Sequence, residues 1–122
     1  MGHLVLAVAL AASVASCDAL RGGDITGKTI RYQVEYNPSA QDLVHHNALS
    51  ISYSTSEGQR EQKNVSLPWT RVVGTAQPGF KASVTAQFSG FGTIACRILA
   101  NNKVIQSRTS AEEPYSTVEC ST

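Results

Sequence analysis

The sequence contains few of the side chains on which most enzymes and nucleic-acid-binding proteins depend. Ten basic and nine acidic residues make up 16% of the 122 residues, leave a formal charge of +1, and are joined by only three histidines. So small an imbalance provides no electrostatic basis for nucleic acid, or for an anionic membrane surface, as the main partner. A chain of this length corresponds to one domain that can bury its own core.

Motifs for catalysis and for metal binding are also missing. The sequence has no glycine-rich phosphate loop and no G-x-S-x-G nucleophile motif, since Phe88-Ser89-Gly90 lacks the first glycine. The pair His45-His46 would point to opposite sides of a strand, and no thiolate or acidic cluster adjoins it. We therefore interpret the histidines as part of a solvated loop, and we predict a protein that is not an enzyme and needs no cofactor.

A long hydrophobic run is missing as well. The nearly uniform apolar stretch Leu4–Val14 has 11 residues, whereas a helix that spans a membrane needs about 20, so the stretch fits the apolar region of a signal peptide. Val14-Ala15-Ser16-Cys17 follows it and resembles a bacterial lipobox, in which small residues precede a cysteine that receives diacylglycerol. The sequence therefore predicts a signal peptide over residues 1–16 and lipidation of Cys17.

An ordinary secretory signal is the alternative at this end of the chain. Cleavage near Ala15 or Ser16 would leave Cys17 without a special role. Signal peptides usually begin with lysine or arginine, and here only His3 precedes the apolar run. Both alternatives predict an exported protein.

Short stretches of alternating apolar and polar residues predict the rest of the fold. Residues 17–27 are polar and glycine-rich, which predicts a flexible tether before a folded domain at residues 28–122. The expected strands are Lys28–Tyr36, Ala48–Thr55, Arg60–Leu67, Arg71–Thr75, the stretch around Ala82–Phe88, the two arms of Gly92–Ile105, and Tyr115–Cys120. This pattern predicts an all-β fold, an antiparallel β-sandwich with an immunoglobulin-like Greek key of about seven strands.

Alternation also predicts which side chains enter the core. In the first expected strand, Ile30, Tyr32, Val34 and Tyr36 share one face. In the second, Leu49, Ile51 and Tyr53 should point inward, while Ser50, Ser52 and Ser54 point outward.

The segment Gly92–Ile105 is the expected hub of this fold. Cys96 lies on the apolar side of the first arm, and Asn101-Asn102 can adopt the left-handed backbone that a tight hairpin requires. With Cys17 assigned to lipidation, Cys120 is the only plausible partner of Cys96, so we expect a disulfide that pins the C-terminal segment to the hairpin. A reactive thiol is the alternative, but no histidine or basic cluster adjoins Cys96 to lower its pKa.

The single tryptophan, Trp69, has two interpretations. It follows Leu67-Pro68, and proline is typical of a strand edge or corner because it cannot donate to a β-ladder. The ring either fills the open end of the core or is an exposed anchor for a partner, since tryptophan is enriched among interface hot spots.

Several of these features occur together in one protein family. They are Tyr32-Gln33-Val34, then Val65-Ser66-Leu67-Pro68-Trp69-Thr70, then Ala95-Cys96-Arg97-Ile98 followed by a turn and Val104, and finally Tyr115 and Cys120. Over roughly residues 30–120 the chain resembles the extracytoplasmic domain of the MmpS proteins, small mycobacterial membrane proteins that accompany MmpL transporters. The resemblance implies an actinobacterial source, a β-sandwich, and a role in assisting the export of lipids or siderophores by an RND-type transporter.

The N-terminal segment departs from that family pattern. The MmpS proteins carry an uncleaved transmembrane helix, whereas this chain has a short, lipobox-like signal. We therefore expect a lipid-anchored relative in the cell envelope, held at the outer face of the plasma membrane by Cys17 and docked on a transporter or envelope complex.

Two further function classes stay open. The first is an envelope carrier that binds a small molecule, lipid or siderophore between its sheets, which would need an interior cavity of about 300 Å³ or more. The second is a structural or adhesive surface protein, which would self-associate or bind wall polymers.

Overall fold

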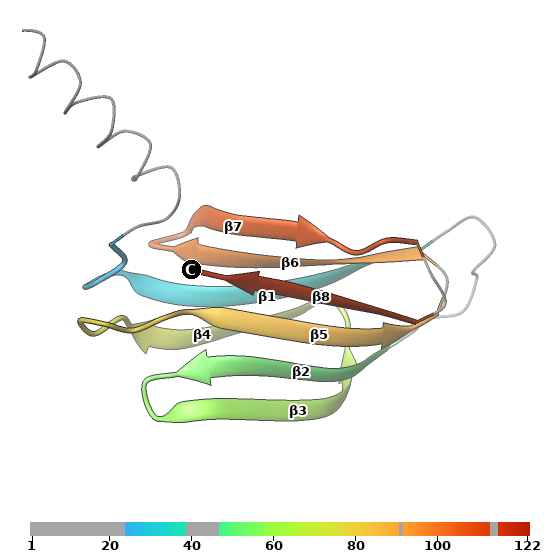
Figure 1. Cartoon of the computed structure of the whole chain (residues 1–122), viewed down its shortest axis with the longest axis horizontal. Coiled ribbons are helices and arrows are strands. Elements are labelled where there is room, and N and C mark those ends of the chain that lie inside the picture. The colour runs from blue at the N-terminus through green and yellow to red at the C-terminus, as the bar shows by residue number, and fades with distance from the viewer. Residues whose placement is uncertain (1–23, 39–46, 91, 113–114) are drawn as a thin grey trace, which may run out of the picture.

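Two antiparallel sheets pack face to face in the computed structural model, which describes residues 24–38, 47–90, 92–112 and 115–122 (Figure 1). The strands are β1 (Thr29–Pro38), β2 (Asn47–Thr55), β3 (Gly58–Ser66), β4 (Trp69–Thr75), β5 (Ser83–Ser89), β6 (Gly92–Ala100), β7 (Lys103–Thr109) and β8 (Tyr115–Ser121). One sheet has the order β4-β1-β6-β7 and the other β3-β2-β5-β8. The predicted β-sandwich is confirmed, with eight strands among the described residues rather than about seven.

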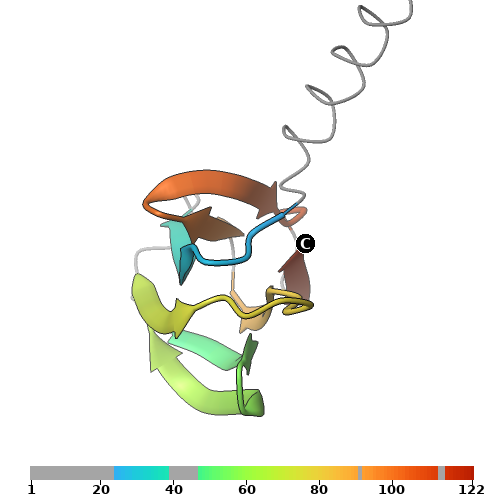
Figure 2. The same cartoon turned by 90° about the vertical axis from the view of Figure 1, so that its left-hand side faces the viewer.

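The core lies between the two sheets and follows the predicted alternation in most strands. In β1, Ile30, Tyr32 and Val34 are fully buried, and in β5 the same holds for Val84 and Ala86. Figure 2 views the two layers end-on from the side at which β1 begins. Because each inner face presents apolar side chains from alternate positions of its strands, the two faces form one continuous hydrophobic cluster.

Strand β2 departs from the alternation, and two predictions there were wrong. Leu49 is 49% exposed instead of buried, and Ser54 is 8% exposed instead of facing solvent. The pairing of β2 with β5 shifts register between Ala48 and Ser50, so Ala48 enters the core in place of Leu49. A bulge of this kind is invisible to an argument that assumes a strict two-residue period.

Ser54 is buried because it takes part in a hydrogen-bond cluster that joins the sheets. The Tyr32 hydroxyl of β1 donates to the Ser54 carbonyl at 2.9 Å and lies 2.9 Å from Ser54 Oγ. Ser54 Oγ donates to the Lys81 carbonyl at 2.9 Å, and the Ser83 amide donates to both hydroxyl oxygens at 2.9 and 3.2 Å. One tyrosine of the first sheet is thereby bonded to two strands of the second.

Replacing Tyr32 by phenylalanine should lower the free energy of unfolding by about 1–3 kcal/mol, because it removes a buried hydroxyl together with its hydrogen bonds to Ser54 and Ser83. Burial raises the pKa of Tyr32 above its ordinary value of 10.0. The wild-type hydroxyl therefore stabilises the fold fully below pH 10, and this contribution declines as the pH rises from about 10 toward the folded-state pKa. Urea denaturation across that range measures both effects.

Tyr115→Phe is the matched control for this experiment, because the Tyr115 side chain is 75% exposed. The control should keep the wild-type stability at pH 7. The difference between wild type and Tyr32→Phe should shrink above pH 10. A difference that is absent at pH 7, or constant through pH 11, would contradict the proposed role of the hydroxyl.

The predicted β6–β7 hairpin is present, with β6 as an inner strand between β1 and β7 and with β7 at the edge of the sheet. Asn101 and Asn102 have φ values of 51° and 65° in the left-handed region, as a two-residue turn requires. Asn101 also bonds to the start of β1, since its amide donates to the Thr29 carbonyl and its Oδ1 accepts from the Thr29 amide, both at 2.9 Å.

The disulfide between Cys96 of β6 and Cys120 of β8 is present and joins the two sheets. Both cysteines are fully buried, and their Cα atoms lie 6.0 Å apart. The covalent link and the Tyr32 cluster therefore connect different strands of the two sheets.

The packed region includes residues that we expected in the tether. Ile25 is buried in the core, and the Gly27 amide donates to the Ala76 carbonyl at 2.8 Å. Packing against the core thus begins at Ile25 within the described residues, because one apolar side chain in a polar segment is enough to dock it. Cys17 and His45-His46 lie outside the described residues.

Candidate partner-binding groove

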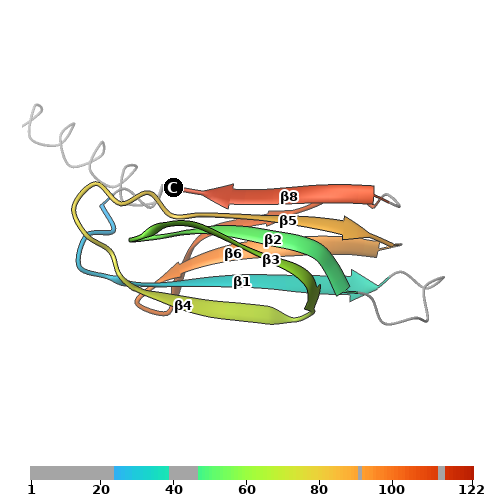
Figure 3. The same cartoon turned by 90° about the horizontal axis from the view of Figure 1, so that it is seen from below.

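A groove of about 450 Å³ runs along the neighbouring edge strands β3 and β4. Figure 3 shows these two strands on the same side of the sandwich. In the sequence, the short segment Leu67-Pro68 connects them. The groove is lined by Tyr53, Thr55, Ser56, Glu57, Arg60, Glu61, Gln62, Arg71, Val72 and Val73. We call this surface the edge groove.

Tyr53 forms the inner part of the edge groove, and the ring of Trp69 packs against it. Tyr53 of β2 is buried, and its ring centroid lies 5.3 Å from that of Trp69, the first residue of β4. The Trp69 indole Nε1 donates to Gln62 Oε1 of β3 at 3.1 Å. Trp69 is half-buried and packs against the core, so the ring closes the edge of the sandwich as the first interpretation predicts. Its contact with a partner stays a prediction.

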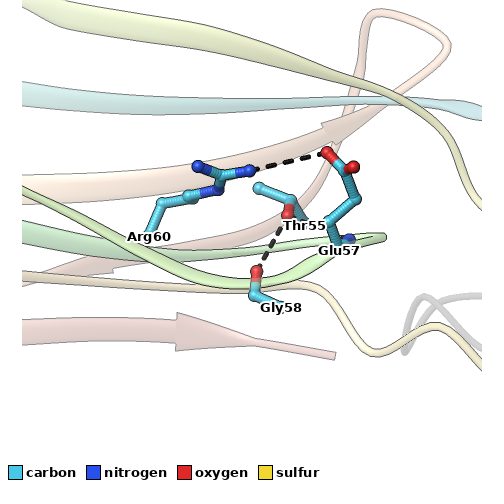
Figure 4. Close-up of polar contacts among 4 residues, drawn as sticks. All are labelled: Thr55, Glu57, Gly58 and Arg60. Carbon is cyan, nitrogen blue, oxygen red and sulfur yellow. Dashed lines mark hydrogen bonds and ion pairs between the residues drawn. The ribbon is translucent and has the colours of Figure 1, made fainter.

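The edge groove carries two arginines and two glutamates on its outer part. The Arg71 guanidinium carbon lies 5.8 Å from the centre of the Tyr53 ring, a cation–π distance. Arg60 Nη2 lies 3.5 Å from Glu57 Oε1 in an ion pair that is mostly exposed (Figure 4). Because water screens an exposed pair, this contact contributes little to stability and both groups can exchange it for a ligand.

A tight turn places Glu57 at one end of the edge groove. Thr55 Oγ1 donates to the Gly58 carbonyl at 2.8 Å and accepts from the Glu57 amide at 3.1 Å (Figure 4). Gly58 has a φ of 117°, which a residue with a side chain rarely adopts. The turn therefore fixes the backbone of Glu57 while its carboxylate stays at the surface.

The comparison with known protein families decides the identity of the chain. Residues 6–121 match the family described as Mycobacterium membrane protein. The chain belongs to this family, that of the MmpS-type mycobacterial membrane proteins. The match confirms the resemblance that the Leu67-Pro68-Trp69 and Cys96-Arg97-Ile98 motifs indicate, and no curated protein matches the chain. Family membership implies association with a membrane, and the disulfide indicates an exported protein.

Two kinds of feature are absent from the described residues of this MmpS-type chain. No group of three or more histidine, cysteine, aspartate or glutamate side chains is placed to hold a metal ion there. In the same ranges, no helix has the length and apolar character needed to cross a membrane.

The sequence predicts a role for Trp69, whose ring contacts Tyr53, but it does not predict the edge groove. Arg60 and Glu61 lie on β3, an edge strand, where charged side chains protect the edge from pairing with another chain. The proximity of Arg60 to Arg71 and Tyr53 was not predicted, because the three residues come from strands of two different sheets.

Proposed function

We propose that this protein is a non-enzymatic accessory of an RND-type transporter of the MmpL class and assists the export of lipids or siderophores. Membership of the MmpS-type family over residues 6–121 is the observation that supports this role. The domain acts through protein–protein contacts in the cell envelope. Diacylglycerol on Cys17 holds it at the outer face of the plasma membrane.

The edge groove is the proposed contact with the transporter. Strand β4 is the outer strand of its sheet, so one edge presents backbone groups to which a partner strand can bond. Within Trp69–Thr75 the only charge is Arg71, whereas β3 carries Arg60, Glu61 and Lys63, which discourage strand addition. An extended, acidic segment of the partner would add to β4 and pair with Arg71.

Co-purification tests the proposal. A tagged full-length chain is isolated from the membranes of its native host in mild detergent, and its companions are quantified by mass spectrometry. We expect an RND-type transporter with the wild type and about tenfold less of it with Arg71→Glu, equivalent to about 1.4 kcal/mol of binding free energy.

Lys103→Glu is the matched control, since it makes the same change of charge at an exposed position on β7, at the far edge of the sheet. The control should retain the transporter. Absence of every transporter from the wild-type sample would refute the accessory role. Equal recovery with the two variants would place the contact elsewhere on the domain.

A carrier of a small or lipid ligand is a second candidate function. The volume of the edge groove, about 450 Å³, lies in the range of ligand sites. The binding site would be this groove rather than the space between the sheets, which fully buried side chains such as Ile51 and Val84 occupy. Detection of a co-isolated lipid or siderophore, bound to the purified protein in native mass spectrometry, would favour this candidate.

A further inference from the structure

The two sheets of the sandwich differ in charge. Strands β4, β1, β6 and β7 contain five basic residues and one acidic residue, whereas β3, β2, β5 and β8 contain two of each. The charged residues of the first sheet are Arg31, Glu35, Arg71, Arg97, Lys103 and Arg108. The whole chain has a formal charge of only +1 because most of its acidic residues lie outside these strands. An anionic surface would therefore be attracted to the first sheet, which we call the basic sheet.

A row of four side chains crosses the outer face of the basic sheet near the start of β1. Arg31 pairs with Val72 of β4 on one side and with Leu99 of β6 on the other, and Leu99 pairs with Val104 of β7. Residues directly opposite each other in an antiparallel pair project to the same face of the sheet. Because both neighbours of Arg31 in β1 are fully buried in the core, the row faces away from the core.

The row is apolar on both sides of its single charge. Val72 is 50% exposed and Val104 is 49% exposed, and they are two of the four large hydrophobic side chains that are exposed among the described residues. Leu99 is buried, although it does not belong to the hydrophobic cluster between the sheets. Apolar side chains beside a cation suit a partner that has both anionic and apolar groups.

Arg31 has no counter-ion among the described residues. The other arginine on this face, Arg97, forms an ion pair of 3.0 Å with Glu35, the only acidic residue in the strands of the basic sheet. The Arg31 side chain is half-buried, and its Nε is fully buried without a hydrogen-bond partner in the described ranges. Partial burial strengthens the attraction of the guanidinium for an anion, and its terminal N–H groups match the geometry of a phosphate.

The row lies at the end of the sandwich to which the N-terminal segment connects. Figure 1 shows that β1 begins, β6 ends and β7 begins at this end. The described chain starts at Asp24, seven positions after Cys17, so a lipid on Cys17 would lie within about 25 Å of Asp24. This step rests on the proposed lipidation, although an anchor formed by the apolar stretch that ends at Val14 would hold the domain nearly as close. The row therefore stays near the membrane surface.

We propose that the outer face of the basic sheet docks on the anionic phospholipid surface of the membrane that anchors the chain. The Arg31 guanidinium binds a lipid phosphate, and Val72 and Val104 contact the apolar part of the interface. An acidic protein surface would satisfy the charge but would not require the two exposed valines. Val72 also lines the edge groove, so docking places that groove beside the bilayer.

NMR of the full-length protein in bicelles tests the proposal. One preparation contains phosphatidylcholine alone, the other contains about 30% of the anionic phosphatidylglycerol, and both include a phosphatidylcholine with a spin-labelled head group. In the anionic bicelles, the spin label should relax the amides of Leu99 and Val104 more than about tenfold faster than those of Ser52 and Thr117, because the sheets lie about 10 Å apart and the effect falls with the sixth power of distance. Ser52 and Thr117 lie on the outer face of the other sheet. The docking constant, obtained from these rates, should fall at least about fivefold in the neutral bicelles.

Variants in the row should weaken docking. Arg31→Gln should lower the docking constant about fivefold, the effect of one basic residue at an anionic membrane surface. Arg31→Lys keeps the charge and should lower it less than about threefold, which separates the charge from the packing of the side chain. Val104→Ala should lower it about threefold, because less apolar surface reaches the interface.

Two variants on the other sheet serve as matched controls. Lys63→Gln on β3 removes one exposed positive charge, and Leu49→Ala on β2 shortens a side chain that is 49% exposed, as Val104 is. Each should leave the docking constant within about twofold of the wild type. Circular dichroism confirms that every variant is folded.

Four results would overturn the proposal. They are equal relaxation of the two outer faces, docking that does not depend on phosphatidylglycerol, wild-type docking in Arg31→Gln, and a loss in Lys63→Gln as large as that in Arg31→Gln. The last result would mean that the membrane responds to the total charge of the domain and not to this face. Because the bicelles contain no transporter, the outcome is independent of the co-purification, and the two proposals can fail separately.

Discussion

Replacing Cys96 and Cys120 together by alanine should lower the free energy of unfolding by about 3–4 kcal/mol, because the disulfide closes a loop of about 25 residues in the unfolded chain. The two cysteines are separated by 24 positions, and both are fully buried. A domain of this size has a total stability of about 5–15 kcal/mol. The melting temperature should therefore fall by about 10–20 °C. Thermal and urea denaturation of the purified protein measure the change.

Two controls separate the disulfide from other effects. Wild-type protein in reductant loses the link but keeps its sulfur atoms, so its difference from the double variant reports the packing contribution of the two side chains. Cys17→Ser should melt as the wild type does, because Cys17 is not part of the bond. Equal melting temperatures with and without reductant would contradict the expected stabilisation.

Cys17→Ser should move most of the protein from the membrane to the soluble fraction. Diacylglycerol on the thiol would supply two acyl chains, which suffice for stable anchoring. Without them, the apolar stretch Leu4–Val14 has 11 residues, and as a helix it would extend about 16 Å across a hydrocarbon layer about 30 Å thick. Ultracentrifugation and immunoblotting of washed membranes measure the distribution.

The double variant of Cys96 and Cys120 is the matched control for this loss of a thiol, and it should stay with the membrane. Mass spectrometry of a protease digest of the wild-type protein should show the added mass of diacylglycerol on the peptide that contains Cys17. Retention of Cys17→Ser on membranes at the wild-type level would refute the lipid anchor. The N-terminal segment itself would then hold the protein.

Local pattern was enough to predict most of the fold. Alternation identified the buried face of β1, and the asparagine pair at 101 and 102 identified the hairpin, because both signals arise from neighbours in the chain. The prediction failed at Leu49 and Ser54, where a bulge and a hydrogen-bond cluster with Tyr32 override the two-residue period. The burial of Ile25 was missed for a similar reason, since it depends on the distant Ala76 region that it meets.

The sequence by itself determined the β-sandwich class, the Cys96–Cys120 pair and the MmpS-type family, because each depends on short motifs or on their order. The tertiary structure alone decided where binding surfaces lie. Arg60, Arg71 and Tyr53 meet in the edge groove only because β3 and β4 become adjacent edges of two sheets. Val72 and Val104 likewise share one row with Arg31 only because β1 and β6 lie between β4 and β7. Such contacts depend on the pairing of distant strands, which no local pattern records.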